Sequence, residues 1–425
     1  MHIEIQPSSL SGSVRIPGSK SHTIRAVAIA CLARGESVIE QPLDSLDTQA
    51  AVNTYRALGA LVDTTGPHWH IDGTAGRLQG PKEVIDVGNS GTALRIAMGS
   101  AALLPPSAKV TFTGDEQIRR RPHGPLLQSL NDLGAKARSI AGDGTAPLEI
   151  SGQLTGGKTT VDGASSQYLS SLLLACPLAK EDSEIRVNNL NEWPYVQITL
   201  NWLNSQGIKY QQEDWNRFLV QGGQTYGGFR RAIPADFSSA TFFLVAAAVT
   251  GSTVTLEGLE MSDAQGDKAV VHYLELMGAI VERQHDRIKI TGGQLEAVDI
   301  DMNTMPDALP AMAVAAAVAK GQSRLFNVAQ ARIKETDRIA GMARELAKMG
   351  IRCEELPDGL VIHGGSLKGA ELCGYGDHRI VMALVVAGLA AKRTTSVDTA
   401  EAAAVTFPNF VELMTNVGAN IRTRE

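Results

Sequence analysis

Six times along this chain of 425 residues, a helix-like segment ends in the same way, with a glycine followed by Ala or Ile. Glycine just past a helix readily adopts the left-handed conformation that ends the helix. Self-similarity at a nearly fixed interval, here about 70 residues, indicates a repeated supersecondary unit and constrains the fold more than any single motif. The six glycines are Gly59, Gly134, Gly207, Gly278, Gly350 and Gly418.

After five of these glycines the chain runs through an apolar stretch, a polar turn and a second stretch that ends in Gly, which predicts helix, strand, turn, strand. The sixth copy stops before its second strand. The unpaired segment Ile3-Glu4-Ile5-Gln6 could supply that strand, so we expect the chain to begin and end in the same sheet.

Each copy also holds a second segment that is rich in Ala, Leu and Val and has almost no polar face, which indicates a buried helix. Ser, Asn or Asp precedes each of these segments, as is typical of helix N-caps. Plain capping explains them, but six helices with one layout also suggest that their N-termini gather and form an anion site. The segments are 24–32, 92–104, 168–178, 240–249, 308–319 and 380–391.

Six copies divide naturally as three plus three. The glycine-rich passage 222–228 is the predicted break between the third and fourth copies. If the N-terminal strand completes the sixth copy, the chain connects the two domains twice, near Pro17-Gly18 and near Pro234. A double connection favours hinge closure.

Composition narrows the class of function. The net charge of −6 argues against a general nucleic-acid binder, and no apolar segment reaches the length needed to cross a membrane. The four cysteines show no CxxC spacing, which favours reduced, buried thiols. With no apolar signal core at the N-terminus, we expect a cytoplasmic protein. We also expect a monomer.

One motif matches a nucleotide-binding pattern without its structural context. Residues 152–159 read G-x-x-x-x-G-K-T, but a P-loop must lead from a strand into a helix. Here β-branched residues follow, and the repeat assigns this stretch to a strand–turn–strand link. We therefore predict a turn and no nucleotide site.

Cations lie beside the proposed helix starts. A charged pair on a helix is usually only solvated, as Lys334 and Arg338, spaced i, i+4 on one predicted helix face, could be. An acidic protein has nevertheless placed Lys or Arg at several predicted anion sites, and Arg binds phosphate or carboxylate in a bidentate manner. We therefore expect small substrates with several negative charges. The cations are Lys20, Arg25, Arg95, Arg121, Lys334, Arg338 and Arg379, the last beside His378.

Several motifs resemble signatures of the 5-enolpyruvylshikimate-3-phosphate synthase family, and they occur in family order over nearly the whole chain. They are Pro17-Gly18-Ser19-Lys20-Ser21, Gly88-Asn89-Ser90-Gly91-Thr92, Arg121-Pro122, Ser165-Ser166-Gln167, Pro306-Asp307, Lys334-Glu335-Thr336-Asp337-Arg338, Asp377-His378-Arg379 and Phe407-Pro408.

The resemblance implies an α/β fold of two domains, each of three βαβαββ units around buried parallel helices, an inside-out α/β barrel. The domains would be residues 1–17 with 235–425, and 18–234, with the active site in the cleft. The implied activity is a transferase of the shikimate pathway of aromatic amino acid biosynthesis. It moves the enolpyruvyl group of phosphoenolpyruvate to the 5-hydroxyl of shikimate 3-phosphate, without a metal or cofactor. Glyphosate is the family's donor-mimicking inhibitor.

The resemblance also implies roles for individual residues. Asp307 would take the hydroxyl proton, and Glu335 and Lys20 are candidates for protonating the methylene carbon. Phosphoenolpyruvate would be held by Lys20, Gly91, Arg121, Gln167, Arg338 and Arg379. Shikimate 3-phosphate would be held by Lys20, Ser21, Arg25, Ser165, Ser166, Gln167, Tyr195, Asp307, Gln330 and Lys334.

The chain departs from the family pattern at three positions. Gln330 stands where the family often has Asn, Val405 replaces a usual Lys, and Glu192 replaces a frequent Ser. The last two departures leave open a binding paralogue with weakened catalysis. The related transferase that acts on UDP-N-acetylglucosamine typically has a reactive Cys in the loop before its Arg-Pro, and this loop, residues 114–118, has none. An RNA 3′-phosphate cyclase would need ATP and a basic surface, and neither the P-loop-like sequence nor the net charge of −6 supports that function.

Overall fold

The computed structural model describes residues 1–424, and the chain divides into two compact units. The central unit is Gly18–Ile233, and the terminal unit joins Met1–Pro17 to the chain from Pro234 onward. The chain therefore passes from one unit to the other after Pro17 and again after Ile233. The break predicted at 222–228 is wrong, because this passage continues into a strand of the central unit.

Each unit contains three sheets with one common topology. Each sheet has four strands, which are named below in spatial order. The first and second strands pair in parallel, and the second and third and the third and fourth pair antiparallel. In the central unit the sheets are, in spatial order, β14 (Arg230–Ala232), β3 (Glu36–Glu40), β5 (His68–Asp72) and β4 (Leu61–Asp63); β6 (Ile85–Asp86), β7 (Lys109–Thr113), β9 (Leu148–Gly152) and β8 (Ala135–Ser139); and β10 (Gly157–Asp162), β11 (Ser183–Asn188), β13 (Arg217–Val220) and β12 (Tyr210–Glu213).

The terminal unit repeats this arrangement. Its sheets are β2 (Ser11–Arg15), β15 (Thr253–Glu257), β17 (Arg287–Thr291) and β16 (Ile280–Arg283); β18 (Ile300–Asp301), β19 (Gln322–Phe326), β21 (Gly359–His363) and β20 (Arg352–Leu356); and β22 (Glu371–Leu372), β23 (Thr395–Val397), β1 (His2–Gln6) and β24 (Asn420–Arg424).

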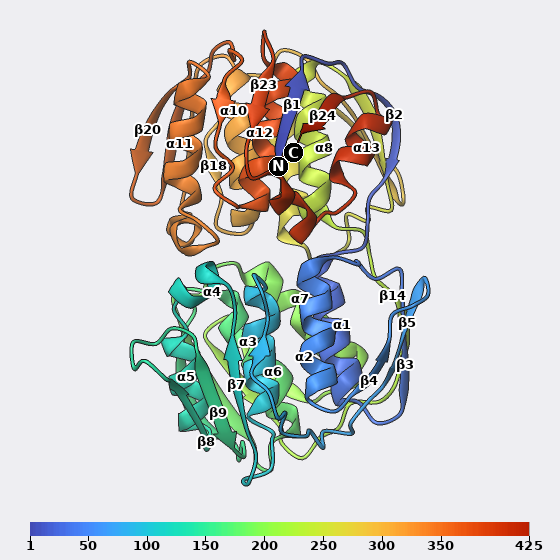
Figure 1. Ribbon diagram of the computed structural model, residues 1–425, viewed down its shortest axis with the longest axis vertical. Coiled ribbons are helices and arrows are strands. Elements are labelled where there is room, and N and C mark those ends of the chain that lie inside the picture. Colours follow the sequence, from blue (N-terminus) through green and yellow to red (C-terminus); the bar gives the residue numbers. More distant parts are fainter. Residues whose placement is uncertain (425) are drawn as a thin grey trace. The chain divides into compact units, whose positions relative to one another are not determined.

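The two ends of the described chain meet in one sheet. Strand β1 lies antiparallel to both β23 and β24, with Ile3 opposite Val397 on one side and Thr423 on the other. Figure 1 shows the two termini next to each other on the terminal unit. The prediction that the N-terminal strand completes the sixth copy is therefore confirmed.

Two further strands join a sheet that belongs to a distant copy. Strand β14 follows the third copy but pairs in parallel with β3 of the first, and β2 pairs in parallel with β15 of the fourth. Each strand lies directly before a passage of the chain from one unit to the other, so the sheet that it joins is closed by a segment distant in sequence.

The buried helices form the core of each unit. They are almost wholly apolar on every side, so they cannot face water and must be covered by sheets. In Figure 1 the central unit's buried helices run between the sheet that holds β3 and β5 and the sheet that holds β7 and β9. The helices are α1 (Lys20–Leu32), α3 (Gly91–Ala101), α6 (Ser166–Ala175), α8 (Phe237–Thr250), α10 (Leu309–Val318) and α12 (His378–Ala390).

Small residues let two of these helices approach closely. The Gly99 amide of α3 donates to the Ser171 hydroxyl of α6 at 3.1 Å. A Cβ at Gly99 would lie 2.6 Å from the Ser171 carbonyl oxygen, a distance that side chains do not tolerate. Glycine at this position therefore sets the spacing of α3 and α6.

A second helix in each copy is amphipathic and ends two residues before one of the six repeat glycines. All six of these glycines have positive φ, so their predicted role as left-handed helix stops is confirmed. These helices are α2 (Leu46–Ala57), α5 (Gly124–Asp132), α7 (Trp193–Ser205), α9 (Ala269–Leu276), α11 (Arg338–Lys348) and α13 (Phe410–Asn416).

Short helical turns complete the fold. They are α4 (Glu116–Arg120) and the 3₁₀ turns η1 (Cys176–Leu178), η2 (Gly266–Lys268), η3 (Pro306–Ala308), η4 (Ala329–Ile333) and η5 (Ala400–Val405). Cys31 and Cys176 are buried, Cys353 and Cys373 are half-buried, and all four are unpaired thiols. Among the described residues, no helix combines the length and apolar character that a membrane crossing requires.

Candidate active site

Side-chain caps were predicted for all six buried helices and begin four of them. Ser90, Ser165, Asp236 and Asp377 each accept a hydrogen bond from an amide in the first turn. Ser19 stands before α1 but makes no such bond. Asp307 is not a cap, because η3 precedes α10 and places Ala308 at the cap position.

In the central unit, the first residue of α1 lies beside the start of α3. The Lys20 Nζ is 3.0 Å from Asp47 Oδ2, and both side chains are largely buried. The Ser90 hydroxyl donates to the main-chain oxygen of Asp47 at 3.2 Å. Asp47 therefore fixes the ammonium of Lys20 next to the N-terminus of α3. Sequence analysis missed Asp47, which lies on α2 outside the motifs.

A second group of side chains surrounds Gly91 at the first position of α3. The Arg95 Nη1 donates to Gln167 Oε1 at 2.8 Å, and the Gln167 amide donates to Thr92 at 3.0 Å. The Arg121 guanidinium lies so close that a Cβ on Gly91 would be 2.6 Å from its Nη1. The structure thus brings together Gly91, Arg121 and Gln167, three of the residues predicted to hold the donor.

A buried histidine lies beside these arginines. Burial and, to a lesser extent, the positive charges of Arg95 and Arg121 lower the pKa of His123 to about 2. The ring is therefore neutral at physiological pH and adds no charge to the cations around Gly91. Sequence analysis did not single out His123.

Arg25 acts as a link among three helices. Its guanidinium donates to Ser21 O of α1, Ser170 of α6, and Tyr195 O and Thr199 of α7, at 2.7–3.2 Å. Burial lowers the pKa of Arg25 to about 10, which still leaves it charged at neutral pH. Its contacts with protein groups align the starts of α6 and α7, whereas its predicted contact with the acceptor phosphate stays a prediction.

The start of α6 carries the predicted serine pair. Ser165 caps the helix, and the Ser166 hydroxyl donates to Glu192 Oε2 at 2.9 Å. Glu192 is 2% exposed and has a left-handed backbone with φ 58° directly before α7. Tyr195 follows in the first turn of α7. A carboxylate therefore lies where the resemblance predicts a phosphate.

In the terminal unit, Arg338 binds three carboxylates. Its Nε is 2.8 Å from Asp377 Oδ2, its Nη1 is 2.9 Å from Asp307 Oδ1, and its Nη2 pairs with Glu335. Arg338 is 1% exposed. Burial lowers the pKa of Arg338, but the three carboxylates, Asp377 most of all, raise it more, so the net shift is upward.

Arg379 contacts the same carboxylate from α12. Its Nη2 lies 2.8 Å from Asp307 Oδ2, so the two oxygens of Asp307 are held by two different guanidinium groups. The structure therefore brings together Asp307, Glu335, Arg338 and Arg379, all of which the resemblance singles out.

Asp267 in η2 is a further carboxylate of this cluster. It is 2% exposed, and the Ser238 hydroxyl at the start of α8 donates to it. The pKa of Asp267 is raised to about 6, chiefly by burial and also by the charge of Asp307, while the charge of Arg379 acts to lower it. No sequence pattern indicated Asp267, because its importance comes from the fold, which places it near Asp307.

The segment before α11 differs from the prediction. Lys334 and Arg338 do not share a helix face, because α11 begins at Arg338 and Lys334 follows η4. Asp337 caps α11 by accepting from the Ala340 amide at 3.0 Å. Gln330 is buried in η4. The turn before the helix therefore presents Lys334 separately from Arg338.

Each unit thus contributes its own cluster of predicted residues. The central unit holds Lys20, Ser21, Arg25, Gly91, Arg121, Ser165, Ser166, Gln167 and Tyr195, and the terminal unit holds Asp307, Gln330, Lys334, Glu335, Arg338, His378 and Arg379. Across residues 1–424, no group of three or more His, Cys, Asp or Glu side chains is arranged to hold a metal ion.

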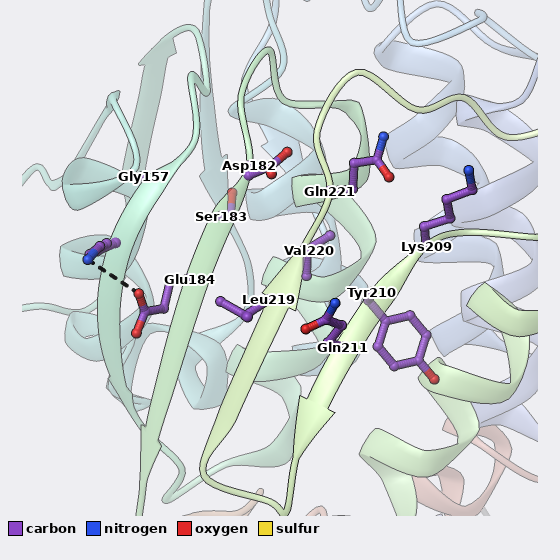
Figure 2. A pocket seen from close by; sticks show the side chains of 11 residues that line it. Gly157, Asp182, Ser183, Glu184, Lys209, Tyr210, Gln211, Leu219, Val220 and Gln221 are labelled. Carbon is purple, nitrogen blue, oxygen red and sulfur yellow. Dashed lines mark ion pairs between the residues drawn. The ribbon is translucent and has the colours of Figure 1, made fainter.

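A pocket of ≈ 670 Å³ lies over the sheet β10-β11-β13-β12, away from the predicted site residues. Figure 2 shows Glu184 on this sheet at one end of a dashed ion pair. Its partner is Lys158, whose Nζ lies 3.5 Å from Glu184 Oε2. Lys158 belongs to the P-loop-like sequence, which connects β9 to β10 and therefore leads into a strand and not into a helix, as predicted. Glu184 also pairs with Arg186 and Arg217, which makes this a surface charge network.

Comparison with known proteins finds relatives of one family along nearly the whole chain. Residues 5–414 match the family described as EPSP synthase (3-phosphoshikimate 1-carboxyvinyltransferase). The chain is 51% identical over 421 residues to the 3-phosphoshikimate 1-carboxyvinyltransferase of Ruminiclostridium cellulolyticum, and the match covers 99% of each sequence. It is equally similar, at 51% over 425 residues, to the protein of that name from Acetivibrio thermocellus, with 100% of each covered.

A solved structure has the same fold. The EPSP synthase from Acinetobacter baumannii aligns with a TM-score of 0.85 at 28% sequence identity, and the alignment covers 100% of both chains. The relatives carry the name of the transferase that acts on 3-phosphoshikimate, so the alternative that acts on UDP-N-acetylglucosamine is not favoured.

Proposed function

The chain belongs to the EPSP synthase family, and from this we propose how its two residue clusters serve the reaction. The protein is a transferase that moves the enolpyruvyl group of phosphoenolpyruvate to the 5-hydroxyl of shikimate 3-phosphate and releases phosphate. The observation that supports the proposal most is the set of carboxylates around Arg338 and Arg379, because the reaction needs both cations and proton carriers.

The first requirement is to bring two anions together. In the central unit, Lys20, Arg121 and Gln167 offer donors near the N-terminus of α3, where helix amides add positive charge. We assign phosphoenolpyruvate to these groups together with Arg338 and Arg379, and the acceptor phosphate to Ser165 and its neighbours at the start of α6. Fixed cations screen the repulsion between the substrates, so positioning and electrostatics supply much of the rate.

The second requirement is to move protons. As the acceptor oxygen bonds to C2 of phosphoenolpyruvate, Asp307 takes the hydroxyl proton, and C3 receives a proton from Glu335 or Lys20. The intermediate then loses a proton from C3 while the bond from C2 to the phosphate oxygen breaks. Phosphate leaves, and the enolpyruvyl double bond forms again.

The contacts of Asp307 suggest how its basicity is controlled. Two guanidinium groups hold its oxygens at 2.8 and 2.9 Å, and such pairing disfavours proton uptake by a carboxylate. The carboxylate and phosphate of the donor compete for these same guanidinium groups. Donor binding therefore frees Asp307 from its cations and makes it a better base.

The test is a steady-state assay of phosphate release with both substrates. The parent protein should turn over, and Asp307→Asn should lose most of kcat while shikimate 3-phosphate still binds in calorimetry, because Asn keeps the shape but cannot take the proton. Glu335→Gln should lower kcat more than it raises KM. Asp286→Asn, an exposed carboxylate in the same unit, is the control.

Near-normal kcat in Asp307→Asn would remove Asp307 as the base. Ligand binding without turnover in the parent would instead identify the binding paralogue that the departures at Val405 and Glu192 left open. The monomeric state and the cytoplasmic location stay predictions, and sedimentation and cell fractionation test them.

A further inference from the structure

The carboxylate of Glu192 lies at the start of α6, and the proposed function gives it no role. Ser166 is the first residue of this helix, and its hydroxyl donates to Glu192 Oε2 at 2.9 Å. Glu192 is 2% exposed, so its charge has little solvent around it. The unpaired amides of a helix start favour an anion, and a glutamate of the chain itself lies there.

The backbone holds this arrangement in place. Glu192 has φ 58° and ψ 36°, a left-handed conformation that is uncommon for a residue other than Gly, Asn or Asp. Its carbonyl accepts from the Tyr195 amide at 3.0 Å and so begins α7. The same residue therefore starts α7 and directs a carboxylate to α6.

We propose that Glu192 competes with the phosphate of the acceptor for the start of α6 and thereby sets the affinity of this enzyme for shikimate 3-phosphate. The inference rests on the proposed function, which assigns Ser165 and Ser166 to that phosphate. A phosphate that binds Ser166 must replace the carboxylate as the hydrogen-bond acceptor and must also bear its repulsion. Arg25 cannot offset this freely, because its guanidinium is already shared among α1, α6 and α7.

The substitution Glu192→Gln separates charge from shape. Gln keeps an oxygen that accepts from Ser166 and fills nearly the same volume, but it carries no charge. We expect the KM for shikimate 3-phosphate to fall about tenfold or more, because like charges a few ångströms apart repel more strongly near a protein surface than they do in water. The KM for phosphoenolpyruvate should stay within twofold, since the donor residues lie around Gly91 and Arg338.

Two further variants test the charge itself. Glu192→Asp keeps the charge and should keep an acceptor KM within about threefold of the parent, far from the Gln value. Glu181→Gln removes one exposed carboxylate from the same unit and should change neither KM. Inorganic phosphate serves as a probe without turnover, and half-maximal thermal stabilisation of Glu192→Gln should need about tenfold less phosphate than that of the parent.

The experiments distinguish a failure of this inference from a failure of the proposed function. If the parent shows no phosphate release, the function fails, whereas the phosphate titration still reads the competition. An active parent whose acceptor KM is unchanged or raised in Glu192→Gln overturns the inference and leaves Glu192 as a residue that only begins α7. An equal fall of both KM values also overturns it, because the effect is then not confined to the acceptor.

Discussion

Gly91 shows how a single missing side chain shapes the proposed donor site. A Cβ at this position would lie 2.6 Å from Arg121 Nη1 and 3.3 Å from Arg95 Nη1. The guanidinium of Arg121 is the end of a flexible side chain, so it can move away, but it then leaves the start of α3. Gly91 is needed here for space and not for backbone conformation.

Gly91→Ala should therefore raise the KM for phosphoenolpyruvate. Hydrogen bonds to charged groups contribute about 1.5–3 kcal/mol, so displacement of Arg121 should raise this KM by roughly one to two powers of ten. The acceptor KM should change little. Steady-state kinetics with each substrate varied in turn provide the measurement, and Gly227→Ala, where a Cβ meets no atom within 4 Å, is the control. An unchanged donor KM in Gly91→Ala would show that Arg121 does not hold the donor.

Residue types predicted the helix caps well, because capping is a local interaction read from a few adjacent positions. Four side-chain caps were found as expected. The partners of the cations were not predictable in this way. Asp47 reaches Lys20 from the next helix, and Asp267 approaches Asp307 from a different copy of the repeat, so only the fold brings them together.

At the scale of elements, the repeat predicted helices, strands and even the return of the N-terminal strand to the sixth sheet. The repeat pattern gave wrong predictions where a strand pairs with a strand of another copy, and where a 3₁₀ turn comes before an α-helix. The glycine-rich passage 222–228 looked like a domain break, but β14 after it pairs with β3. Lys334 looked helical, but η4 ends before α11 starts. Pairing between distant strands and short 3₁₀ turns leave no periodic signal.

The contact of η2 with the start of α8 should make stability depend on pH through Asp267. Its pKa is raised from 3.8 to about 6 in the folded protein, so the folded state binds the proton more tightly than the unfolded state. The free energy of unfolding should therefore fall as pH rises from about 4 to about 6, and Asp267→Asn should lack this loss. The difference between the variant and the parent should grow by about 2 kcal/mol over that range.

Urea unfolding at pH 4, 5, 6 and 7 measures this difference, with Asp286→Asn as the exposed control in the same unit. The asparagine of the variant makes a different hydrogen bond with Ser238 than Asp267 does, and this adds a pH-independent offset to the difference between the variant and the parent. Only the growth of the difference bears on the prediction. Parallel curves for the parent and Asp267→Asn would show that Asp267 titrates in the folded protein as it does when unfolded.

At the scale of the whole molecule, strands from one part of the chain complete sheets of copies that are distant in sequence. The ends of the chain share the sheet of β1 and β24, and β2 and β14 close sheets that belong to other copies. The residues proposed to act in the reaction are also divided, with the predicted cations Lys20 and Arg121 in the central unit and Asp307 with its guanidinium partners in the terminal unit. A ligand pair that uses both groups must stabilise both units.

Hydrogen exchange measured by mass spectrometry tests this for the intact chain. With shikimate 3-phosphate and glyphosate each at about 100 times Kd, stabilisation of about 2.7 kcal/mol per ligand should slow exchange about a hundredfold wherever opening releases that ligand. We expect slower exchange in α1 and α6 of the central unit and also in α10 and α11 of the terminal unit. Shikimate, which lacks the phosphate, is the control and should protect these helices much less. Protection confined to the central unit would mean that Arg338 and Arg379 do not hold the donor mimic, and the assignment of the terminal cluster to catalysis would then fail.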